Sequence, residues 1–583
     1  MKKNKVAWKF GGKAGEGIMV TGLIFSKILS RGGYNVFDYV EYPSLIKGGH
    51  NNYYVRADAN KVYSHLKPLD LLVALDKLTV DLHLDELRPG AGIIYDGEKV
   101  HLDKQNLKRQ DVNLYPVPLL RLAEEAGGKI MRNTVALGAS VALTDYDFNI
   151  LSDALAEIFK RKGDKVINNN ISAARAGYDH CKNNFEGFGV KLEKIQAPER
   201  ILLTGNEAIG IGAIKAGCKF YAAYPMTPTS PILHFMAAQE RKFNLVVKHA
   251  EDEIAVINMA IGAGAVGVRS MLATSGGGFS LMTEALGLAS ISETPIVVVE
   301  GQRPGPATGM PTWTEQGDLQ FILNAAQGEG PRIVMAPGDV EDCFYLTIDA
   351  FNLAEKYQMP VIIISDTHVA ESHVNVERFK TDGVKIERGK FLSDQDLDKM
   401  GTYNRYQLTD DGISPRTLPP QKLGVHLANS YEHDEYGYAS EDSEMRTKMV
   451  DKRAKKLELA QDEIPPPPLY GPSDADITLI GWGSTKGAIR EAMEILKRDG
   501  LSANYLQVVY LNPFPSEKVS EVMSSAKKTM VVENNKTGQL SRLIAEKTLL
   551  KADYKLLKYD GRAFFPEEII QKVREALRVR EVL

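Results

Sequence analysis

Short, continuous apolar runs punctuate this 583-residue chain. A run of four to eight apolar residues bounded by turn residues is typical of a strand that is buried on both faces of a parallel sheet. Three such runs, near residues 6–10, 201–204 and 477–481, are each followed by a glycine-containing turn and then a helical segment. This repeated order of strand, turn and helix predicts an α/β protein with three doubly wound α/β domains.

The polar stretches between these patterns set the expected domain boundaries. Residues 371–472 are polar and charged and end in the proline run IPPPP, which predicts a stiff spacer. The second half of the stretch YEHDEYGYASEDSEMRTKMVDKRAKKLELAQDE, residues 431–463, has a helix-forming, mixed-charge composition that predicts a solvent-exposed helix. The expected organisation is therefore a first domain, a linker, a second domain, a polar insertion with its linker, and a third domain, at residues 1–187, 188–200, 201–370, 371–472 and 473–583.

Composition excludes several classes of protein. The chain has 71 Lys and Arg against 75 Asp and Glu, and its net charge of −4 argues against a nucleic-acid binder. Its three cysteines lie far apart and form no CxxC pair, so they indicate neither a disulfide framework nor an iron–sulfur or zinc site. No apolar run approaches the roughly 20 residues that span a bilayer. We expect a cytoplasmic protein without membrane segments.

The segment from Lys219 to Pro311 carries the most chemistry. Each of its apolar runs ends in a loop with a distinctive side chain or glycine cluster. Because the carboxyl ends of parallel strands meet at one edge of a sheet, these loops predict a single site. They supply a hydroxyl, a carboxylate, three consecutive glycines and a guanidinium, from Thr227, Glu253, Gly276, Gly277, Gly278 and Arg303.

The polar candidates each have a structural alternative. Glu253 follows Glu251 and Asp252 and begins a small-residue helix, so all three acids could simply favour the helix dipole. Arg303 can bind a carboxylate through two parallel hydrogen bonds, or it can form a surface ion pair. Thr227 can donate its hydroxyl to the same carboxylate, or it can be a turn residue between prolines.

Glycines suggest two places where backbone approaches a ligand. Thr274-Ser275-Gly276-Gly277 can be a phosphate cradle or a spacious turn without a ligand. The turn at Gly15 and Gly17 in the first domain is similar to a phosphate loop, but such a short motif equally fits a turn that binds nothing.

Four stretches give the chain a family resemblance: YPMTP, EDE before the small-residue helix, TSGGG and QRPGPATGMPTWTEQGDL. Together they resemble the alpha subunit of the 2-oxoacid:ferredoxin oxidoreductases, in particular the 2-oxoglutarate type in which a gamma domain is fused ahead of alpha. The resemblance implies a gamma-type first domain, a second domain that binds the pyrimidine of thiamine diphosphate, and a third domain similar to the C-terminal domain of transketolases.

The resemblance also implies roles for particular residues. Glu253 is expected to contact the pyrimidine ring of thiamine diphosphate and control its proton, while Thr227 and Arg303 hold the C1 carboxylate of a 2-oxoacid. Further cofactor contacts are expected at Tyr224, Pro225, Thr274, Ser275, Gly276 and Gly277. In the first domain, contacts to coenzyme A or to a distal carboxylate of the substrate are expected at Lys47, Gly48, Gly49 and His50.

The chain lacks parts that this chemistry needs. It has no GDG motif for Mg²⁺ and diphosphate and no cysteine set for a [4Fe-4S] cluster. The resemblance places both on a beta subunit, which implies an (αβ)₂ heterotetramer that transfers electrons to ferredoxin.

The expected reaction is the coenzyme A-dependent oxidative decarboxylation of 2-oxoglutarate to succinyl-CoA, or the reverse carboxylation of a reductive TCA cycle. The alternatives are pyruvate or a broad range of 2-oxoacids as substrate, a non-oxidative thiamine enzyme, and a non-catalytic scaffold that binds nucleotide or acyl-coenzyme A.

Overall fold

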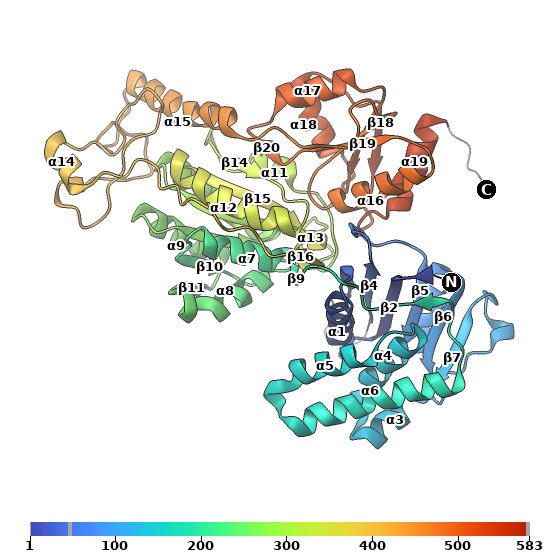
Figure 1. Ribbon diagram of the computed structural model, residues 1–583. Helices are drawn as coiled ribbons and strands as arrows, with labels where there is room; N and C mark the ends of the chain where they lie inside the picture. The colour runs from blue at the N-terminus through green and yellow to red at the C-terminus, as the bar shows by residue number, and fades with distance from the viewer. Residues whose placement is uncertain (1, 45–48, 579–583) are drawn as a thin grey trace. The chain divides into compact units, whose positions relative to one another are not determined.

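The computed structural model describes residues 2–44 and 49–578, which fold into two compact units. The first unit contains Met1–Leu203 with two later segments, Glu371–Arg378 and Phe565–Glu568. The second unit contains Thr204–Ala370, Phe379–Phe564 and Ile569–Leu583. Both units are mixed α/β structures (Figure 1). The large sheet of the first unit combines parallel and antiparallel strands, whereas the sheets of the second unit are largely parallel, as the apolar runs predict.

The first unit is built on an eight-stranded sheet in the order β7-β6-β5-β2-β4-β3-β16-β9. Strands β7, β6, β5 and β2 are parallel, whereas β4 runs antiparallel to both β2 and β3. The strands of this sheet are β2 (Lys5–Lys13), β3 (Asn35–Glu41), β4 (His50–Asp58), β5 (Leu69–Ala74), β6 (Leu87–Asp96), β7 (Asn113–Val117), β9 (Arg200–Thr204) and β16 (His373–Glu377). A separate two-stranded pair joins β1 (Lys2–Lys3) to β8 (Val190–Lys191).

Helices bury the apolar residues of this sheet. Trp8 and Phe10 of β2 lie in a core with Phe25 of the first helix, and their rings stack at centroid distances of 4.3–5.6 Å. The helices of the unit are α1 (Ile18–Arg31), α2 (Lys77–His83), α3 (Leu119–Ala126), α4 (Arg132–Leu143), α5 (Phe148–Phe159) and α6 (Asp164–Asn184).

Two strands of the first sheet come from places where the sequence pattern predicts something else. The run near residue 201 predicts the opening strand of a second domain, but it forms β9 at the edge of the first sheet. The polar stretch after residue 371 predicts an insertion, but its first residues form β16 between β3 and β9. Periodicity identifies a strand without specifying its partner, because the partner is set by contacts between distant parts of the chain.

The second unit contains a seven-stranded sheet in the order β11-β10-β12-β13-β15-β14-β20, parallel except for the last strand. Its strands are β10 (Phe220–Ala223), β11 (Val246–His249), β12 (Ser270–Thr274), β13 (Ile296–Gln302), β14 (Ile333–Met335), β15 (Pro360–Asp366) and β20 (Tyr510–Asn512). Helices cover both of its faces (Figure 1). They are α7 (Gly205–Lys215), α8 (Ser230–Phe243), α9 (Glu253–Ala265), α10 (Gly276–Ile291), α11 (Leu319–Leu323), α12 (Val340–Tyr357) and α13 (Thr367–Glu371).

A five-stranded sheet in the same unit has the order β17-β19-β18-β21-β22. Its residues Trp482, Leu506 and Val531 share one apolar core with Leu272 and Val298 of the larger sheet. The elements of this region are β17 (Leu469–Tyr470), β18 (Ile477–Gly481), α16 (Thr485–Arg498), β19 (Ala503–Gln507), α17 (Ser516–Ser525), β21 (Thr529–Glu533), α18 (Gln539–Thr548), β22 (Tyr554–Leu557) and α19 (Pro566–Leu577).

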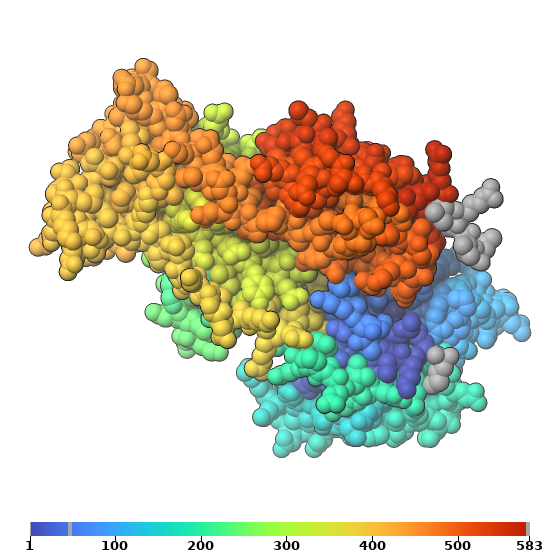
Figure 2. All heavy atoms as spheres, turned by 45° about the horizontal axis from the view of Figure 1, so that its top comes forward, coloured from blue at the N-terminus to red at the C-terminus, as the bar shows by residue number. Residues whose placement is uncertain are grey.

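In sequence, the long polar stretch lies between most strands of the seven-stranded sheet and those of the five-stranded sheet. It contains α14 (Asp394–Met400) and α15 (Ser443–Glu463). Figure 2 shows this stretch, coloured yellow to orange, gathered at one end of the unit. The predicted helix is confirmed by α15, but the expectation that it is solvated is wrong for one of its faces. Lys452 and Lys456 on that face are buried, and both contact Glu293.

Over the described residues, no helix combines the length and the apolar character needed to cross a membrane.

Candidate functional site

The candidate site lies at the carboxyl edge of the seven-stranded sheet. Neighbouring strands β10, β12 and β13 are parallel, so the loops that follow Ala223, Thr274 and Gln302 leave the sheet at the same edge. The sequence predicted that these loops would come together, and the contacts described below join them.

Glu253 is the first residue of α9, and its side chain is buried with 3% exposure. The neighbouring Asp252 caps the helix, since its carboxylate accepts a hydrogen bond from the Ala255 N–H at 2.8 Å. Glu253 is therefore not needed as the cap. Its Oε1 atom is buried and has no hydrogen-bond partner within the described chain. Buried polar atoms are nearly always hydrogen-bonded in folded proteins, so an unpaired carboxyl oxygen indicates a place for a ligand donor.

The glycines of TSGGG create the space around this carboxyl group. A Cβ atom on Gly278 would lie 2.5 Å from Glu253 Oε1 and 2.1 Å from Thr274 Oγ1, which is too close for any side chain. A Cβ on Gly276 would lie 2.4 Å from Asp318 Oδ2, whereas one on Gly277 would meet nothing within 4 Å. The first turn of α10 thus lies between two carboxyl groups and faces open space at Gly277.

Two hydroxyls lie at the same turn. Thr274, the last residue of β12, and Ser275, the residue before α10, are both fully buried. The Ser275 Oγ atom has no hydrogen-bond partner among the described residues. Ser275 and Glu253 therefore both have unpaired polar atoms at this end of α10.

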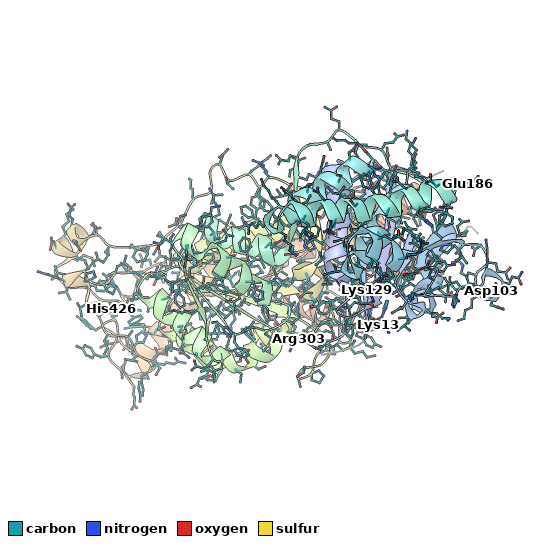
Figure 3. All side chains as sticks on the ribbon, turned by 90° about the horizontal axis from the view of Figure 1, so that it is seen from below. Lys13, Asp103, Lys129, Glu186, Arg303 and His426 are labelled. Carbon is teal, nitrogen blue, oxygen red and sulfur yellow. The ribbon has the colours of Figure 1, made fainter. Side chains whose placement is uncertain are left out.

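Arg303 and Thr227 are also brought together. The Arg303 guanidinium donates a hydrogen bond from Nη1 to the Thr227 backbone carbonyl at 2.8 Å. The sequence predicted a role for the threonine hydroxyl, and this contact leaves that hydroxyl available. Arg303, labelled on the green part of the ribbon in Figure 3, forms no ion pair with any residue that the structure describes. It is only partly buried, so its remaining donors can reach a bound anion.

Tyr224 and Pro225 follow β10 and are exposed. The Tyr224 ring is 39% exposed and lies edge-on to His249, with 6.2 Å between ring centroids. Their expected contacts to a cofactor remain a prediction.

The sequence analysis missed two acids beside this site. Glu300 lies within β13 with 0% exposure, and neither of its carboxyl oxygens has a hydrogen-bond partner in the described structure. Burial, reinforced by the neighbouring Asp318 carboxyl, raises the pKa of Glu300 well above its usual range. Burial also raises the pKa of Asp318. The available signal was a single acid inside the apolar run PIVVVEGQ, where a charge without a partner is costly.

In the first unit, the structure describes two of the four expected contact residues, Gly49 and His50. Lys47 and Gly48 lie outside the described residues, whereas His50 begins β4 directly after Gly49. The His50 Nε2 atom lies 2.8 Å from His83 Nε2, and the His83 Nδ1 atom lies 2.8 Å from Glu86 Oε1. The two Nε2 atoms share one proton, which either ring can donate.

The other ring nitrogen of His50 is Nδ1. That atom is buried and unpartnered within the described chain. Burial and the adjacent His83 lower the pKa of His50 to about 4. His50 is therefore neutral near pH 7, and its Nδ1 atom is available for a hydrogen bond with a ligand.

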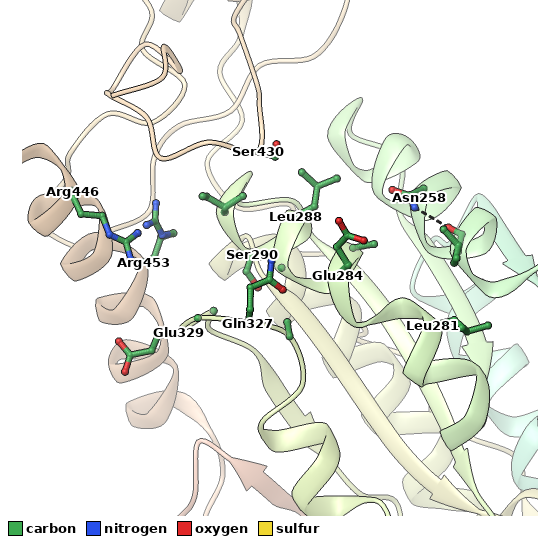
Figure 4. Close-up of a pocket in the computed structure, with 17 residues that line it drawn as sticks. Asn258, Leu281, Glu284, Leu288, Ser290, Gln327, Glu329, Ser430, Arg446 and Arg453 are labelled. Atoms are coloured by element: carbon green, nitrogen blue, oxygen red, sulfur yellow. Dashed lines mark hydrogen bonds between the residues drawn. The ribbon is translucent and has the colours of Figure 1, made fainter. Parts of the chain in front are cut away.

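A separate cavity of about 640 Å³ lies on the second unit, and Glu253, Thr227 and Arg303 do not line it. Figure 4 shows Arg446 and Arg453 of α15 on one side of this cavity and Glu284 and Leu288 of α10 on the other. Within the described residues, no three His, Cys, Asp or Glu side chains gather as a metal site.

Family models match three parts of the chain. Residues 7–180 match the model for pyruvate ferredoxin/flavodoxin oxidoreductase. Residues 211–452 match the thiamine diphosphate-binding model of pyruvate flavodoxin/ferredoxin oxidoreductase. Residues 475–569 match core domain II of pyruvate:ferredoxin oxidoreductase.

The relatives extend over nearly the whole chain. Subunit alpha of 2-oxoacid:ferredoxin oxidoreductase 2 from Aeropyrum pernix is 34% identical over 98% of this chain and 97% of its own length. This chain is an alpha subunit of the 2-oxoacid:ferredoxin oxidoreductase family. Another relative of this alpha subunit, 2-oxoglutarate synthase subunit KorA of Methanothermobacter marburgensis, is 34% identical over 64% of this chain and 98% of its own length.

The fold of this alpha subunit also matches a solved structure. The 2-oxoglutarate:ferredoxin oxidoreductase of Magnetococcus marinus, solved with 2-oxoglutarate, coenzyme A and succinyl-CoA bound, has a TM-score of 0.93 and 35% identity. The match covers 98% of this chain and all of that one. The family resemblance and the α/β fold class predicted from the sequence are therefore confirmed.

Proposed function

We propose that this alpha subunit takes part in the coenzyme A-dependent oxidative decarboxylation of 2-oxoglutarate to succinyl-CoA, with reduction of ferredoxin, or in the reverse carboxylation. One structural observation carries the chemistry: a buried carboxyl with an unpaired oxygen, Glu253, and a guanidinium without an ion pair, Arg303, belong to the same sheet edge. The Magnetococcus enzyme, solved with 2-oxoglutarate, supports the choice of substrate.

The residues at the edge fit thiamine diphosphate, because Glu253 Oε1 lacks a donor and Gly278 leaves no side chain beside it. Glu253 would hold the pyrimidine ring and exchange a proton at Oε1. Tyr224, Pro225 and the TSGG turn would shape the surroundings of the ring. When bound, thiamine diphosphate supplies the electron sink for decarboxylation of a 2-oxoacid.

Arg303 and Thr227 would orient the substrate. A guanidinium can hold a carboxylate by charge-assisted hydrogen bonds, which contribute about 1.5–3 kcal/mol each. Arg303 would bind the C1 carboxylate, and the Thr227 hydroxyl would donate a further hydrogen bond. This grip fixes the carboxylate while leaving the keto carbon exposed to the cofactor.

The first unit would meet coenzyme A. We assign Gly49 and His50 to this contact, with His50 Nδ1 forming a hydrogen bond with the coenzyme. Lys47 and Gly48 belong to the same proposal on sequence grounds alone. Lys47 would instead pair with the distal carboxylate of 2-oxoglutarate if the loop serves the substrate.

The beta subunit would complete the reaction. It would carry Mg²⁺, the diphosphate site and the [4Fe-4S] cluster, since this chain has neither the GDG motif nor a suitable cysteine set. The assembly would be an (αβ)₂ heterotetramer in the cytoplasm.

The direct test is to purify the chain together with its beta subunit and measure ferredoxin reduction. We expect a higher kcat/KM with 2-oxoglutarate than with pyruvate, and no reduction without coenzyme A. Equal or faster turnover of pyruvate would favour the second candidate, a broad-range enzyme, which the relatives named only as 2-oxoacid oxidoreductases support. Tight Mg²⁺-dependent binding of thiamine diphosphate by the isolated chain would contradict a shared site.

Arg303→Ala tests the substrate grip. Loss of one charge-assisted hydrogen bond should raise the KM for the oxoacid by about 10- to 150-fold, with a smaller effect on the KM for coenzyme A. Arg241→Ala, at an exposed position of α8, is the matched control. An unchanged oxoacid KM in Arg303→Ala would remove this residue from the site.

A further inference from the structure

Arg303 is the first residue of a loop, the arginine loop of residues 303–317, which begins and ends beside the carboxyl end of β13. The Gln302 side chain closes the base of this loop, because its Oε1 atom accepts a hydrogen bond from the Asp318 N–H at 3.0 Å. Its Nε2 atom donates a hydrogen bond to the Ser365 carbonyl of the neighbouring strand β15 at 3.1 Å. The base of the arginine loop is therefore fixed to two strands of the seven-stranded sheet.

The last part of the arginine loop is fixed to the other sheet of the same unit. Gln316 is fully buried, and its N–H donates a hydrogen bond to the Asn534 carbonyl at 2.7 Å. Its Oε1 atom accepts one from the Asn534 N–H at 3.0 Å, and its Nε2 atom donates one to the Trp482 carbonyl at 2.9 Å. Trp482 and Asn534 directly follow β18 and β21, which are neighbouring parallel strands. Gln316 is therefore held at the carboxyl edge of the five-stranded sheet.

A second glutamine secures the residues on either side of Asp318. Gln539, the first residue of α18, donates a hydrogen bond from Nε2 to the Gly317 carbonyl at 2.5 Å. Its Oε1 atom accepts one from the Gln320 N–H at 2.9 Å. Gln539 is half-buried, whereas Gln316 has no exposed surface.

The middle of the arginine loop contacts the same part of the unit. The Arg562 guanidinium lies 3.1 Å from the centroid of the Trp313 ring. The Thr314 N–H donates a hydrogen bond to the Gly561 carbonyl at 3.3 Å. The region after β22 therefore supports the loop at a further point.

These hydrogen bonds form one continuous path from the five-stranded sheet to Arg303. Gln539 holds Gly317, which precedes Asp318. The Asp318 N–H in turn binds the Gln302 side chain, and Gln302 precedes Arg303. Energetic coupling can pass along such a contiguous network, and a double-mutant cycle detects it.

We propose that Gln316 and Gln539 position Arg303 for the oxoacid carboxylate by fixing the arginine loop to the five-stranded sheet. The inference rests on the proposed role of Arg303 and gives the five-stranded sheet a part in substrate binding. Both glutamines act through the loop and need no contact with the substrate. A guanidinium that binds a carboxylate through two parallel hydrogen bonds depends on its orientation, so a displaced loop weakens the grip while the positive charge remains.

The main test is the KM for 2-oxoglutarate in the complex with the beta subunit. Gln539→Met keeps the length of the side chain but removes its hydrogen bonds to Gly317 and Gln320. Loss of the contribution of one such bond should raise the oxoacid KM by about 2- to 12-fold, with smaller changes in kcat and in the KM for coenzyme A.

Two further variants accompany this test. Thr537→Ala, exposed two residues before Gln539, is the matched control and should keep the wild-type KM. Gln316→Met removes the side-chain contacts to Asn534 and Trp482 and should raise the oxoacid KM as well. Gln539→Met, at the less buried position, decides the test if Gln316→Met does not assemble.

A double-mutant cycle separates the positioning of Arg303 from a general effect on the fold. Arg303→Ala combined with Gln539→Met should have the oxoacid KM of Arg303→Ala alone, because the group that the loop positions is already absent. An unchanged KM in the glutamine variants, or independent effects that multiply in the double variant, would overturn the inference.

A binding measurement separates this inference from the proposed function. Calorimetric titration of the complex with 2-hydroxyglutarate measures the grip on the carboxylate without turnover. We expect Gln539→Met to weaken this binding by the same factor, and the double variant to bind like Arg303→Ala. A complex that shows these differences but reduces no ferredoxin with any oxoacid would refute the proposed function and support the positioning role. Equal binding by wild type and Arg303→Ala would refute the substrate grip and, with it, this inference.

Discussion

The buried acids near the two ends of helix α10 differ in whether their carboxyl groups have partners. At its first turn, Glu253 and Glu300 are buried with unpaired carboxyl oxygens. Just past its last turn, Glu293 is equally buried, but it contacts the ammonium groups of both Lys452 and Lys456. Burying a charge without a partner is costly, so the unpaired acids need a compensating function, whereas the paired one can be purely structural.

The helix itself contributes to this difference. The N-terminus of a helix favours nearby anions and its C-terminus favours cations. Glu253 near the first turn of α10 and the two lysines near its last turn lie where this rule expects an acid and two bases. One helix therefore separates a site that awaits ligands from a contact that fixes the polar stretch of residues 379–472 to the fold.

The largest expected effect is at the unpaired end. Glu253→Gln keeps the shape of the side chain but removes its proton acceptor, and should lower kcat by about 10²- to 10⁴-fold. Its melting temperature should stay the same or rise, because a neutral amide is cheaper to bury. Ferredoxin reduction and thermal denaturation measure the two effects. Glu251→Gln, exposed two residues earlier, is the control, and a near-normal rate in Glu253→Gln would break the comparison.

Substitution of the paired acid near the last turn of α10 should change the stability of the protein. Glu293→Gln leaves two buried lysines without their carboxylate and should destabilise the protein by about 3–5 kcal/mol. The denaturant midpoint would report this loss, and the rate per folded enzyme should hardly change. Glu284→Gln, at an exposed position of α10, is the matched control. An unchanged midpoint would show that the contacts of Glu293 with the two lysines do not stabilise the fold.

The glycines at the first turn offer a steric test. Gly278→Ala would place a methyl group against Thr274 and Glu253, which should cost about 1–3 kcal/mol and displace the carboxyl group. Gly277→Ala meets open space and should leave the melting temperature of the isolated chain equal or higher. Equal melting temperatures and equal rates for the two variants would mean that the turn does not position Glu253.

The smallest effect concerns pH. Burial lowers the pKa of Lys456 to about 7, although Glu293 opposes the shift. The unfolded chain then binds more protons than the folded one between pH 7 and the ordinary lysine pKa, so this lysine makes the protein more stable as the pH rises. Lys456→Met should lose that gain, and the stability difference in favour of wild type should grow by at most about 1.4 kcal/mol per pH unit. Parallel melting-temperature curves from pH 7 to 9 would contradict this.

The placement of the site could be predicted because it depends on local pattern. Thr227, Thr274 and Arg303 each follow an apolar strand, and parallel strands deliver their following residues to one edge. The unpaired acid in β13 was visible as a charged residue in an apolar run, but only the fold shows that Asp318 lies beside it.

Other features depend on distant parts of the chain. Lys452 and Lys456 lie 159 and 163 residues from Glu293 along the chain. The local composition around the two lysines therefore predicted an exposed helix, because their acidic partner is brought to them only by folding. Likewise, periodicity found the strand near residue 201 but could not show that it joins the first sheet. Long-range pairing is set by tertiary contacts that a local pattern does not contain.

The strand β16 has a consequence for how this polypeptide can be divided. It enters the first sheet between β3 and β9, although 166 residues separate the end of β9 at Thr204 from Glu371, where the chain returns to that unit. A fragment that stops at residue 203 would expose the edge of β3 and leave β9 without its neighbour. Splitting the gene after residue 203 would therefore require a replacement strand for β16, or it would leave a new sheet edge exposed.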